Sequence, residues 1–260
     1  MARVQRPSSP AASYFAPPRP RVFAHRGLAI EAPENTMLAF AKAVAVGVDY
    51  VETDVRASLD GAAVVCHDPD LSRVAGRDIR VDQLTLAELR RIDLGFGQTF
   101  CSLAEALDAF PETRFNIDLK SADVVAPAVD AIRKLNALGR VLVTSFGESR
   151  RRAAIAELPG VATSASARPF VAALLAGKVG SPLAMSRALR GIDAVQVPQK
   201  ALGLRVTTPP MIERLHRAGV EVHVWTINDP GVMLSLLDLG VDGIVTDRAD
   251  LALEIVKNRR

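Results

Sequence analysis

Two carboxylates one residue apart, Glu52 and Asp54, lie in a stretch whose pattern is typical of a β-strand. Alternate side chains of a strand point to the same face, so the two acids share one face. They repel each other unless positive charge lies between them, and a hard divalent cation, Ca²⁺ or Mg²⁺, is the simplest partner. The spacing therefore predicts a metal site. The alternative is a salt-bridge arrangement with Arg26, Arg56 or Lys120.

Two of the four histidines, His25 and His67, are expected at neighbouring strand ends beside these acids. An imidazole titrates near neutral pH, so a pair of them can serve as general base and general acid. The pattern therefore predicts an acid/base pair. His216, on an expected helix, and His223, below a strand end, are assigned structural roles.

Cationic side chains near the same strand ends suit an anionic substrate. Arg26 can donate two hydrogen bonds to a phosphate, and Lys120 adds a point charge. Asp118 can give the cation a third oxygen ligand. A metal ion, an Arg and a Lys around one cavity suit a phosphodiester, because each stabilises charge on its oxygens. Trp225 is expected to cap an apolar or glycerol-like part of the substrate, or to fill space.

These residues can meet only in a fold that brings the ends of several strands together. Short apolar runs alternate with Ala/Leu-rich stretches along the chain, and this pattern predicts a parallel sheet. Eight such strands predict a closed (β/α)₈ TIM barrel, whose catalytic groups lie at the carboxyl ends of the strands. An open doubly wound sheet is the alternative, but no Gly-rich phosphate loop follows the first strand. The expected strands are 22–25, 50–55, 114–119, 141–145, 161–164, 194–198, 221–226 and 243–246.

A hairpin is expected after the second strand, because Asp60-Gly61 is a strong turn signal and no crossover helix fits between 55 and 62. Residues 62–67 should therefore fold back antiparallel and carry His67. Residues 68–101 are expected to form a small insertion with a short helix near 86–92. The remaining helices are expected at 34–46, 102–110, 123–137, 147–157, 167–177, 209–218 and 230–238.

Composition narrows the class of protein. The net charge of +3 is small and spread along the chain, and with two Tyr and one Trp it does not predict a nucleic-acid surface. Two cysteines suggest free thiols in a reducing cytoplasm. No apolar run is long enough to predict integral membrane association. Residues 1–20 hold five prolines and are expected to be a disordered leader, with one domain over 21–260.

Taken together, the motifs resemble those of the glycerophosphodiester phosphodiesterase family, in family order and across most of the chain. The matching motifs are His25-Arg26-Gly27, Pro33-Glu34-Asn35-Thr36, Glu52-Thr53-Asp54-Val55, Asp60-Gly61, His67-Asp68, Trp225-Thr226-Ile227-Asn228 and Asp242-Gly243-Ile244-Val245-Thr246-Asp247.

The resemblance implies a phospholipase-C-like barrel that cleaves glycerophosphodiesters to sn-glycerol 3-phosphate and an alcohol. It implies a divalent ion held by Glu52, Asp54 and the acid of the third strand, with His25 and His67 as the acid/base pair. The family mechanism has a glycerol hydroxyl attack phosphorus, and water then opens the cyclic intermediate. One position departs from the family pattern, since the usual Glu-x-Lys reads Asp118-Leu119-Lys120.

Two other functions remain open at this point. A lysophospholipase D or sphingomyelinase D-like phosphodiesterase shares the barrel and the histidine pair, and a longer apolar groove would favour it. A non-catalytic phosphodiester-binding protein is the third hypothesis. The retention of both His25 and His67 opposes it, because binding alone needs no paired acid and base.

Overall fold

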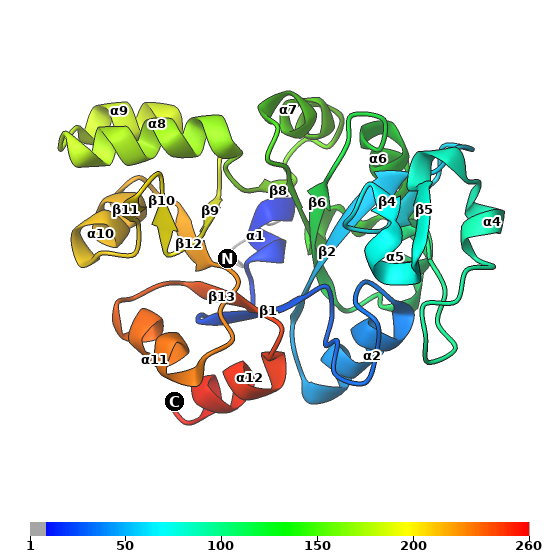
Figure 1. Cartoon of the computed structure of the whole chain (residues 1–260). Coiled ribbons are helices and arrows are strands. Elements are labelled where there is room, and N and C mark those ends of the chain that lie inside the picture. The colour runs from blue at the N-terminus through cyan, green and yellow to red at the C-terminus, as the bar shows by residue number, and fades with distance from the viewer. Residues whose placement is uncertain (1–8, 260) are drawn as a thin grey trace, which may run out of the picture.

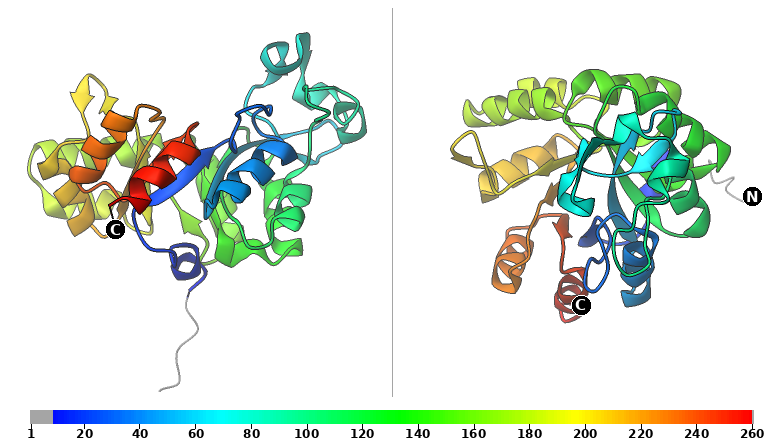
Figure 2. Two further views of the ribbon diagram at one scale, coloured as in Figure 1. Left: turned by 90° about the horizontal axis from the view of Figure 1, so that it is seen from below. Right: turned by 45° about the vertical axis from the view of Figure 1, so that its right-hand side comes forward.

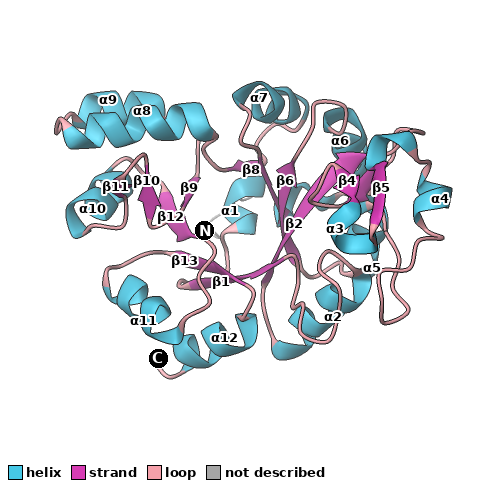
Figure 3. Cartoon of the chain, in the orientation of Figure 1, coloured by secondary structure: helices cyan, strands magenta, loops and turns pink. Residues whose placement is uncertain are grey.

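The structure is a computed structural model that describes residues 9–259. Its centre is a ring of eight parallel strands, surrounded by helices (Figure 1, Figure 3). The ring consists of β1 (Arg21–His25), β2 (Tyr50–Ala57), β6 (Arg114–Leu119), β7 (Val141–Thr144), β8 (Ala162–Thr163), β9 (Ala194–Val197), β12 (Glu221–Val224) and β13 (Gly243–Thr246).

The strands follow one another around the ring in chain order. Continuous ladders run from β8 through β1 to β9, and a parallel bridge between Ser164 and Ala194 brings the two ends together. The predicted TIM barrel is therefore confirmed, as a nearly closed ring. The fifth strand is shorter than expected, because only Ala162 and Thr163 pair regularly with β7.

Helices connect the strands and cover the outside of the barrel. Those between barrel strands are α2 (Met37–Val46), α5 (Leu103–Ala109), α6 (Val125–Lys134), α7 (Glu148–Glu157), α8 (Ala167–Lys178), α9 (Pro182–Ala188), α10 (Pro209–Arg217) and α11 (Pro230–Asp238). The helix α12 (Ala249–Lys257) follows the last strand and packs on β1. The sequence analysis did not predict α9 or α12.

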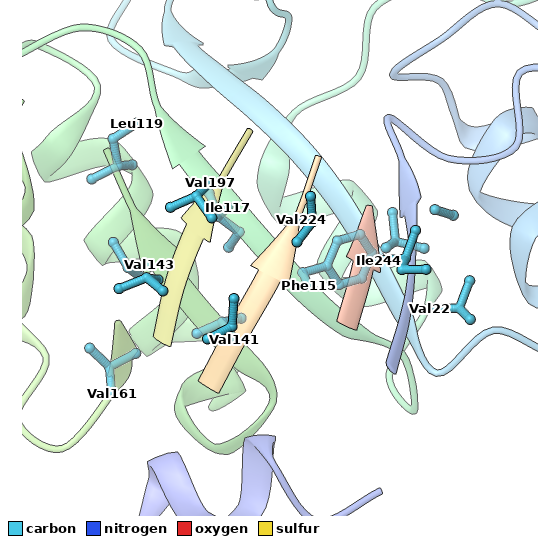
Figure 4. Packing of buried hydrophobic residues seen from close by; sticks show 14 of the residues in the cluster. Val22, Phe115, Ile117, Leu119, Val141, Val143, Val161, Val197, Val224 and Ile244 are labelled. Carbon is cyan, nitrogen blue, oxygen red and sulfur yellow. The ribbon is translucent and has the colours of Figure 1, made fainter. Parts of the chain in front are cut away.

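Side chains along each barrel strand alternate between the helix layer outside the barrel and the barrel interior. Alternate residues such as Val22, Phe115 and Ile244 are buried in one large apolar layer against the surrounding helices (Figure 4). The residues between them point into the barrel. At one end of the interior they form a second apolar cluster that includes Phe23 and Tyr50. At the carboxyl ends of the strands the inward residues are polar, which is where a barrel enzyme holds its site.

The hairpin after β2 is confirmed. The strand β3 (Ala63–Val65) pairs antiparallel with β2, with Val55 opposite Val65. The insertion that follows is more ordered than expected, since it has its own buried apolar cluster. It contains β4 (Asp70–Leu71), α3 (Ser72–Ala75), β5 (Arg77–Arg80), a 3₁₀ turn at Val81–Gln83 and α4 (Leu86–Leu89). It stands over the carboxyl ends of the strands (Figure 2).

The structure differs from the expected disordered leader in residues 9–20; residues 1–8 lie outside the described part. Here α1 (Pro10–Tyr14) lies against the other end of the barrel (Figure 2). The side chain of Tyr14 is fully buried and meets the ring of Tyr50 edge-on, with 5.3 Å between the ring centroids. The prolines of the segment indicated disorder, but the buried aromatic contacts fix its position.

Several smaller features complete the fold. The helix α2 starts at Met37, later than expected, because Thr36 caps it by accepting a hydrogen bond from the Ala39 N–H at 3.3 Å. A hairpin of β10 (Lys200–Ala201) and β11 (Leu204–Arg205) follows β9, and a 3₁₀ turn at Ala137–Arg140 precedes β7. Both cysteines are free. Within residues 9–259, no helix has the length and apolarity needed to cross a bilayer.

Candidate active site

One cavity of about 430 Å³ opens at the carboxyl ends of the strands. The structure brings all eight residues singled out from the sequence to its lining. They are His25, Arg26, Glu52, Asp54, His67, Asp118, Lys120 and Trp225. They come from the ends of four barrel strands and from the hairpin after β2, so the barrel and its hairpin together place them.

Strand register explains how the acids meet. In the ladder between β2 and β6, Asp54 lies directly opposite Asp118, and Glu52 lies opposite Asn116. In the ladder between β1 and β2, His25 lies opposite Glu52. Neighbouring inward positions on adjacent strands therefore carry three carboxylates and an imidazole.

Cations partly neutralise these acids. The Nζ of Lys120 lies 2.8 Å from Asp54 Oδ1 and 2.7 Å from Asp118 Oδ2, and the Nε of Arg26 lies 3.2 Å from Asp54 Oδ2. Burial would raise the pKa of Asp54, but Lys120 and Arg26 outweigh burial and lower it. The salt-bridge alternative is thus realised for Asp54. Arg56 takes no part, since it donates to the carbonyl of His67.

The pKa values of the other two acids are raised, because burial disfavours their charged forms. Burial, and then the Asp54 carboxylate, raise the pKa of Glu52 to about 8. Burial also raises the pKa of Asp118 against the effect of Lys120. The Oδ1 atom of Asp118 is buried and has no hydrogen-bond partner in the described chain.

This donor set suits a hard divalent cation, because its ligands are carboxylate oxygens with a surplus of negative charge and one oxygen is unpaired. Glu52, Asp54 and Asp118 are the residues that would hold such a cation. As the side chains stand, with Lys120 bonded to both acids, no three His, Cys, Asp or Glu groups within residues 9–259 converge closely enough to surround an ion.

His25 is held by a chain of polar groups. Its Nδ1 donates to Asp247 Oδ1 at 2.6 Å, since a carboxylate can only accept. Asn228 donates to the other oxygen of Asp247 at 2.6 Å, and Thr246 donates to Asn228 at 3.0 Å. Burial would lower the pKa of His25, but the bond to Asp247 and the charge of Glu52 raise it. The Nε2 of His25 lies 4.0 Å from Glu52 Oε2.

His67 is held in the same way from the hairpin. Its Nδ1 donates to Asp68 Oδ1 at 2.7 Å. Arg73, on α3 of the insertion, donates to Asp68 Oδ2 at 2.6 Å and to Glu34 Oε2 at 3.1 Å. Arg26 donates to the same Glu34 at 2.9 Å. The insertion is therefore tied to both a histidine and an arginine of the cavity.

The loop after β1 depends on a glycine. Gly27 has a φ of +84°, and a Cβ atom there would lie 2.7 Å from the backbone carbon of Ala39 on α2. Close packing of this loop on α2 lets the backbone N–H of Arg26 donate to Glu52 Oε2 at 3.1 Å. The amide of Asn35 adds a bond of 3.1 Å to Asp54.

Sequence reasoning assigned no role to Asp247, Asn228, Asp68 or Arg73. For the first three a signal was available, since they lie at strand ends or beside His67. No local signal marks Arg73, which lies in the insertion.

The far wall of the cavity is rich in apolar side chains. Its side chains come from the loop after β7, from α8, from the β10–β11 hairpin and from the end of β12. They include Phe146, Phe170, Val171, Pro198, Leu202 and Trp225. Trp225 and Phe146 meet edge-on with ring centroids 6.2 Å apart. One side of the cavity therefore suits charge and the other suits an apolar group.

Comparison with known proteins agrees with this geometry. A model of the "Glycerophosphoryl diester phosphodiesterase family" matches residues 25–251. A Mycobacterium tuberculosis protein described as "Probable glycerophosphodiester phosphodiesterase 2" is 44% identical over 90% of this chain and 89% of its own. A rat protein described as "Lysophospholipase D GDPD1" is 26% identical over 92% of this chain and 86% of its own.

A solved structure has the same barrel. It is an Oleispira antarctica phosphodiesterase in complex with the product sn-glycerol-3-phosphate. The TM-score is 0.77 at 25% identity, over 94% of this chain and 99% of that one.

Proposed function

The chain belongs to the glycerophosphoryl diester phosphodiesterase family and is a phosphoric diester hydrolase, and we propose that His25 and His67 are its acid/base pair. The proposed reaction cleaves a glycerophosphodiester to sn-glycerol 3-phosphate and an alcohol. One observation carries the proposal: both imidazoles line the same cavity, and each is bonded through Nδ1 to a carboxylate. This leaves Nε2 of each ring as the nitrogen that can exchange a proton with substrate.

In this proposal the two histidines act on opposite sides of the phosphorus atom. One takes the proton from the attacking hydroxyl, and the other gives a proton to the leaving alcohol oxygen. The carboxylates of Asp247 and Asp68 hold each ring in one tautomer and stabilise its protonated form. Neither carboxylate needs to contact the substrate for this purpose.

Charge around the cavity supports binding of the phosphate. Arg26 lies at the cavity wall with its guanidinium between Glu34 and Asp54. Lys120 is the other cation of the lining. We assign both to the non-bridging phosphate oxygens, where they would offset the charge that builds up in the transition state.

We assign Glu52, Asp54 and Asp118 as holders of one divalent cation, Ca²⁺ or Mg²⁺. Such a cation, when bound, supplies Lewis-acid polarisation of a phosphoryl oxygen. The shorter Asp118, where the family pattern has Glu, could reach it directly or through water.

A second candidate substrate class is favoured by the apolar wall. A small polar alcohol needs no such surface, whereas the acyl chain of a lysophospholipid would cover Phe170, Val171 and Leu202. The lysophospholipase D or sphingomyelinase D-like hypothesis therefore stays beside the leading one. Both use the same charged half of the cavity.

We also propose that residues 21–260 act as one catalytic domain on a small-molecule substrate in the cytoplasm. The family match over residues 25–251 supports one domain. Cys66 and Cys101 are both buried free thiols, which supports a reducing compartment.

The test is an assay of purified protein on glycerophosphocholine, glycerophosphoethanolamine and lysophosphatidylcholine, with Ca²⁺, Mg²⁺ or chelator. We expect release of glycerol 3-phosphate, or of lysophosphatidic acid from the lysolipid. His25→Ala and His67→Ala should each lower kcat by about 10²–10⁴-fold. The matched control is His216→Ala on α10, which pairs with Asp242 away from the cavity and should keep its activity.

Turnover of either variant near that of the control would contradict the acid/base assignment. The metal assignment is tested separately by thermal unfolding, because an ion that binds only the folded state raises Tm. We expect Ca²⁺ or Mg²⁺ to raise Tm in the native chain and not in Glu52→Gln. Activity unchanged by thorough chelation would exclude the assigned ion.

A further inference from the structure

The helices α8 and α9 carry exposed apolar side chains that the fold does not use. They lie side by side at the outer edge of the barrel, next to the β10–β11 hairpin (Figure 1). Leu175, Val179 and Leu183 are 53%, 78% and 63% exposed. Singly exposed apolar residues are common, but three within nine positions call for an explanation.

Exposed apolar and basic residues alternate along the segment formed by α8 and α9. On α8 the exposed residues Arg168 and Leu175 lie seven positions apart, on one helical face, and exposed Val179 follows as the C-cap. On α9 Leu183 and Arg187 lie four positions apart, and exposed Arg190 follows in the turn after the helix. The opposite faces are buried, where Gly177 of α8 lies close to methionines of α9 and α10. We call these six exposed residues, together with Lys178, the outer α8–α9 face.

Charge is concentrated in the same segment. Residues 167–205 contain six basic residues and one acid, a net charge of +5 against +3 for the whole chain. The rest of the chain is therefore net negative. The basic residues are Arg168, Lys178, Arg187, Arg190, Lys200 and Arg205, and all six are exposed. Within residues 9–259 none of the six forms an ion pair, whereas cations on neighbouring α7 and α10 do.

Helix α8 and the β10–β11 hairpin also contribute residues to the cavity. Phe170 and Val171 of α8 and Leu202 of the hairpin line the apolar wall. Leu202 is also 69% exposed, so it extends from the cavity to the surface. The elements that carry the unpaired cations are thus the ones that border the apolar half of the site.

We propose that the outer α8–α9 face, with the β10–β11 hairpin, docks this protein on an anionic lipid surface. Exposed cations without internal partners gain from anionic headgroups, and apolar side chains among them insert at the boundary of the acyl chains. A second copy of the chain fits less well, since a symmetric contact would bring two positively charged faces together. Docking would bring the apolar wall of the cavity next to lipid.

The test measures binding apart from hydrolysis, so the two proposals can fail separately. Full-length protein is sedimented with vesicles of phosphatidylcholine alone or mixed with phosphatidylglycerol. We expect binding only to the anionic vesicles, and weaker binding as salt is raised. Arg187→Gln with Arg190→Gln should lower the partition coefficient roughly twentyfold, because each basic residue near an anionic surface contributes about fivefold. Val179→Ser with Leu183→Ser should lower it roughly tenfold.

Matched variants control for general effects of charge and apolarity. Lys134→Gln with Lys257→Gln removes two exposed charges from α6 and α12. Leu59→Ser removes a leucine that is 63% exposed, like Leu183, from the β2–β3 turn. Both should bind vesicles as the native chain does. All variants should hydrolyse soluble glycerophosphocholine at the native rate, which also shows that they fold.

Three outcomes would overturn the proposal. The first is equal binding to neutral and anionic vesicles, or no binding to either. The second is an equal loss of binding in the control variants. The third is a dimer in light scattering that Val179→Ser with Leu183→Ser dissociates, because the face would then be covered by a second copy.

Discussion

At the scale of single residues, the site works through pairs: each proposed proton-transfer group is bonded to a carboxylate. The bond from His25 to Asp247 raises the pKa of the imidazole against the effect of burial. In the other direction, the bond to His25 lowers the pKa of Asp247, which therefore stays ionised. His25 should hold its proton to higher pH than an exposed histidine.

Replacing Asp247 by Asn should move the pH dependence of the reaction. The change removes the anion that raises the pKa of His25, so the imidazole loses its proton at lower pH. The limb of the kcat/KM profile that reports His25 should therefore shift to lower pH, with a fall in kcat of about tenfold or more from lost orientation. Asp250→Asn, which alters an acid paired with Arg248 outside the cavity, is the control. An unshifted profile with lower kcat would leave Asp247 a purely structural role.

The sequence allowed us to predict which residues line the cavity, but not which of them form hydrogen bonds and ion pairs with one another. Inward strand positions could be predicted, because a period of two and a closed barrel fix where Glu52, Asp54 and Asp118 point. The position of the Lys120 ammonium could not be predicted, because the side chain is flexible and several acids lie within its reach. The orienting role of Asp247 also required the barrel, which places it 222 residues from His25 in the chain and 2.6 Å away in space.

At the scale of elements, the insertion after β3 acts on the site through one side chain. Arg73 of α3 is 51% exposed, yet it joins Asp68, which holds His67, to Glu34, which holds Arg26. Salt bridges at such exposed positions contribute little to stability. Their effect here should appear in the geometry of the site.

Arg73→Ala should therefore lower kcat/KM by about tenfold to a hundredfold with little change in Tm, because small misplacements of reacting groups are costly. Arg73→Lys should rescue only part of the loss, since an ammonium cannot bond both carboxylates in the geometry of a guanidinium. Arg80→Ala is the matched control, because Arg80 lies in the same insertion and its ion pair is with Asp82, away from the cavity lining. If the alanine and lysine variants behaved alike, or both simply unfolded earlier, the positioning role would be wrong.

Elements with strong local signals were predicted well, and those defined by tertiary contacts were not. The capping box of α5, with Ser102 and Glu105, is present as its sequence indicated. The helix α9 was missed because it is short and begins after a tight turn. The net charge of +3 likewise concealed the positive segment 167–205, since acids elsewhere in the chain cancel it.

At the scale of the whole molecule, the barrel is closed at its two ends by different parts of the chain. The insertion stands over the site, and the segment before β1 covers the other end (Figure 2). There the hydroxyl of Tyr50 donates to the Tyr14 carbonyl at 2.9 Å and accepts from Arg21 at 2.8 Å. Arg21 also pairs with Glu221 at 2.8 Å. This end should contribute to stability and not to turnover.

Substitutions of Tyr14 can test whether this end of the barrel contributes to stability and not to turnover. Its ring is fully buried, but its hydroxyl is buried without a hydrogen-bond partner in the described chain. Tyr14→Ala should lower the free energy of unfolding by about 3 kcal/mol or more, because it removes a packed aromatic ring. Tyr14→Phe keeps the ring and removes the unpaired hydroxyl, so it should be neutral or stabilising.

Urea unfolding measures both variants against the native chain, and kcat on glycerophosphocholine should be unchanged in each. A loss of stability in Tyr14→Phe as large as that in Tyr14→Ala would mean that the hydroxyl has a partner, such as an ordered water. No loss in Tyr14→Ala would mean that residues 9–20 do not cover the barrel in solution. The expected pattern, a loss in stability for Ala alone with full activity, would assign the segment before β1 to the fold and leave the chemistry to the opposite end.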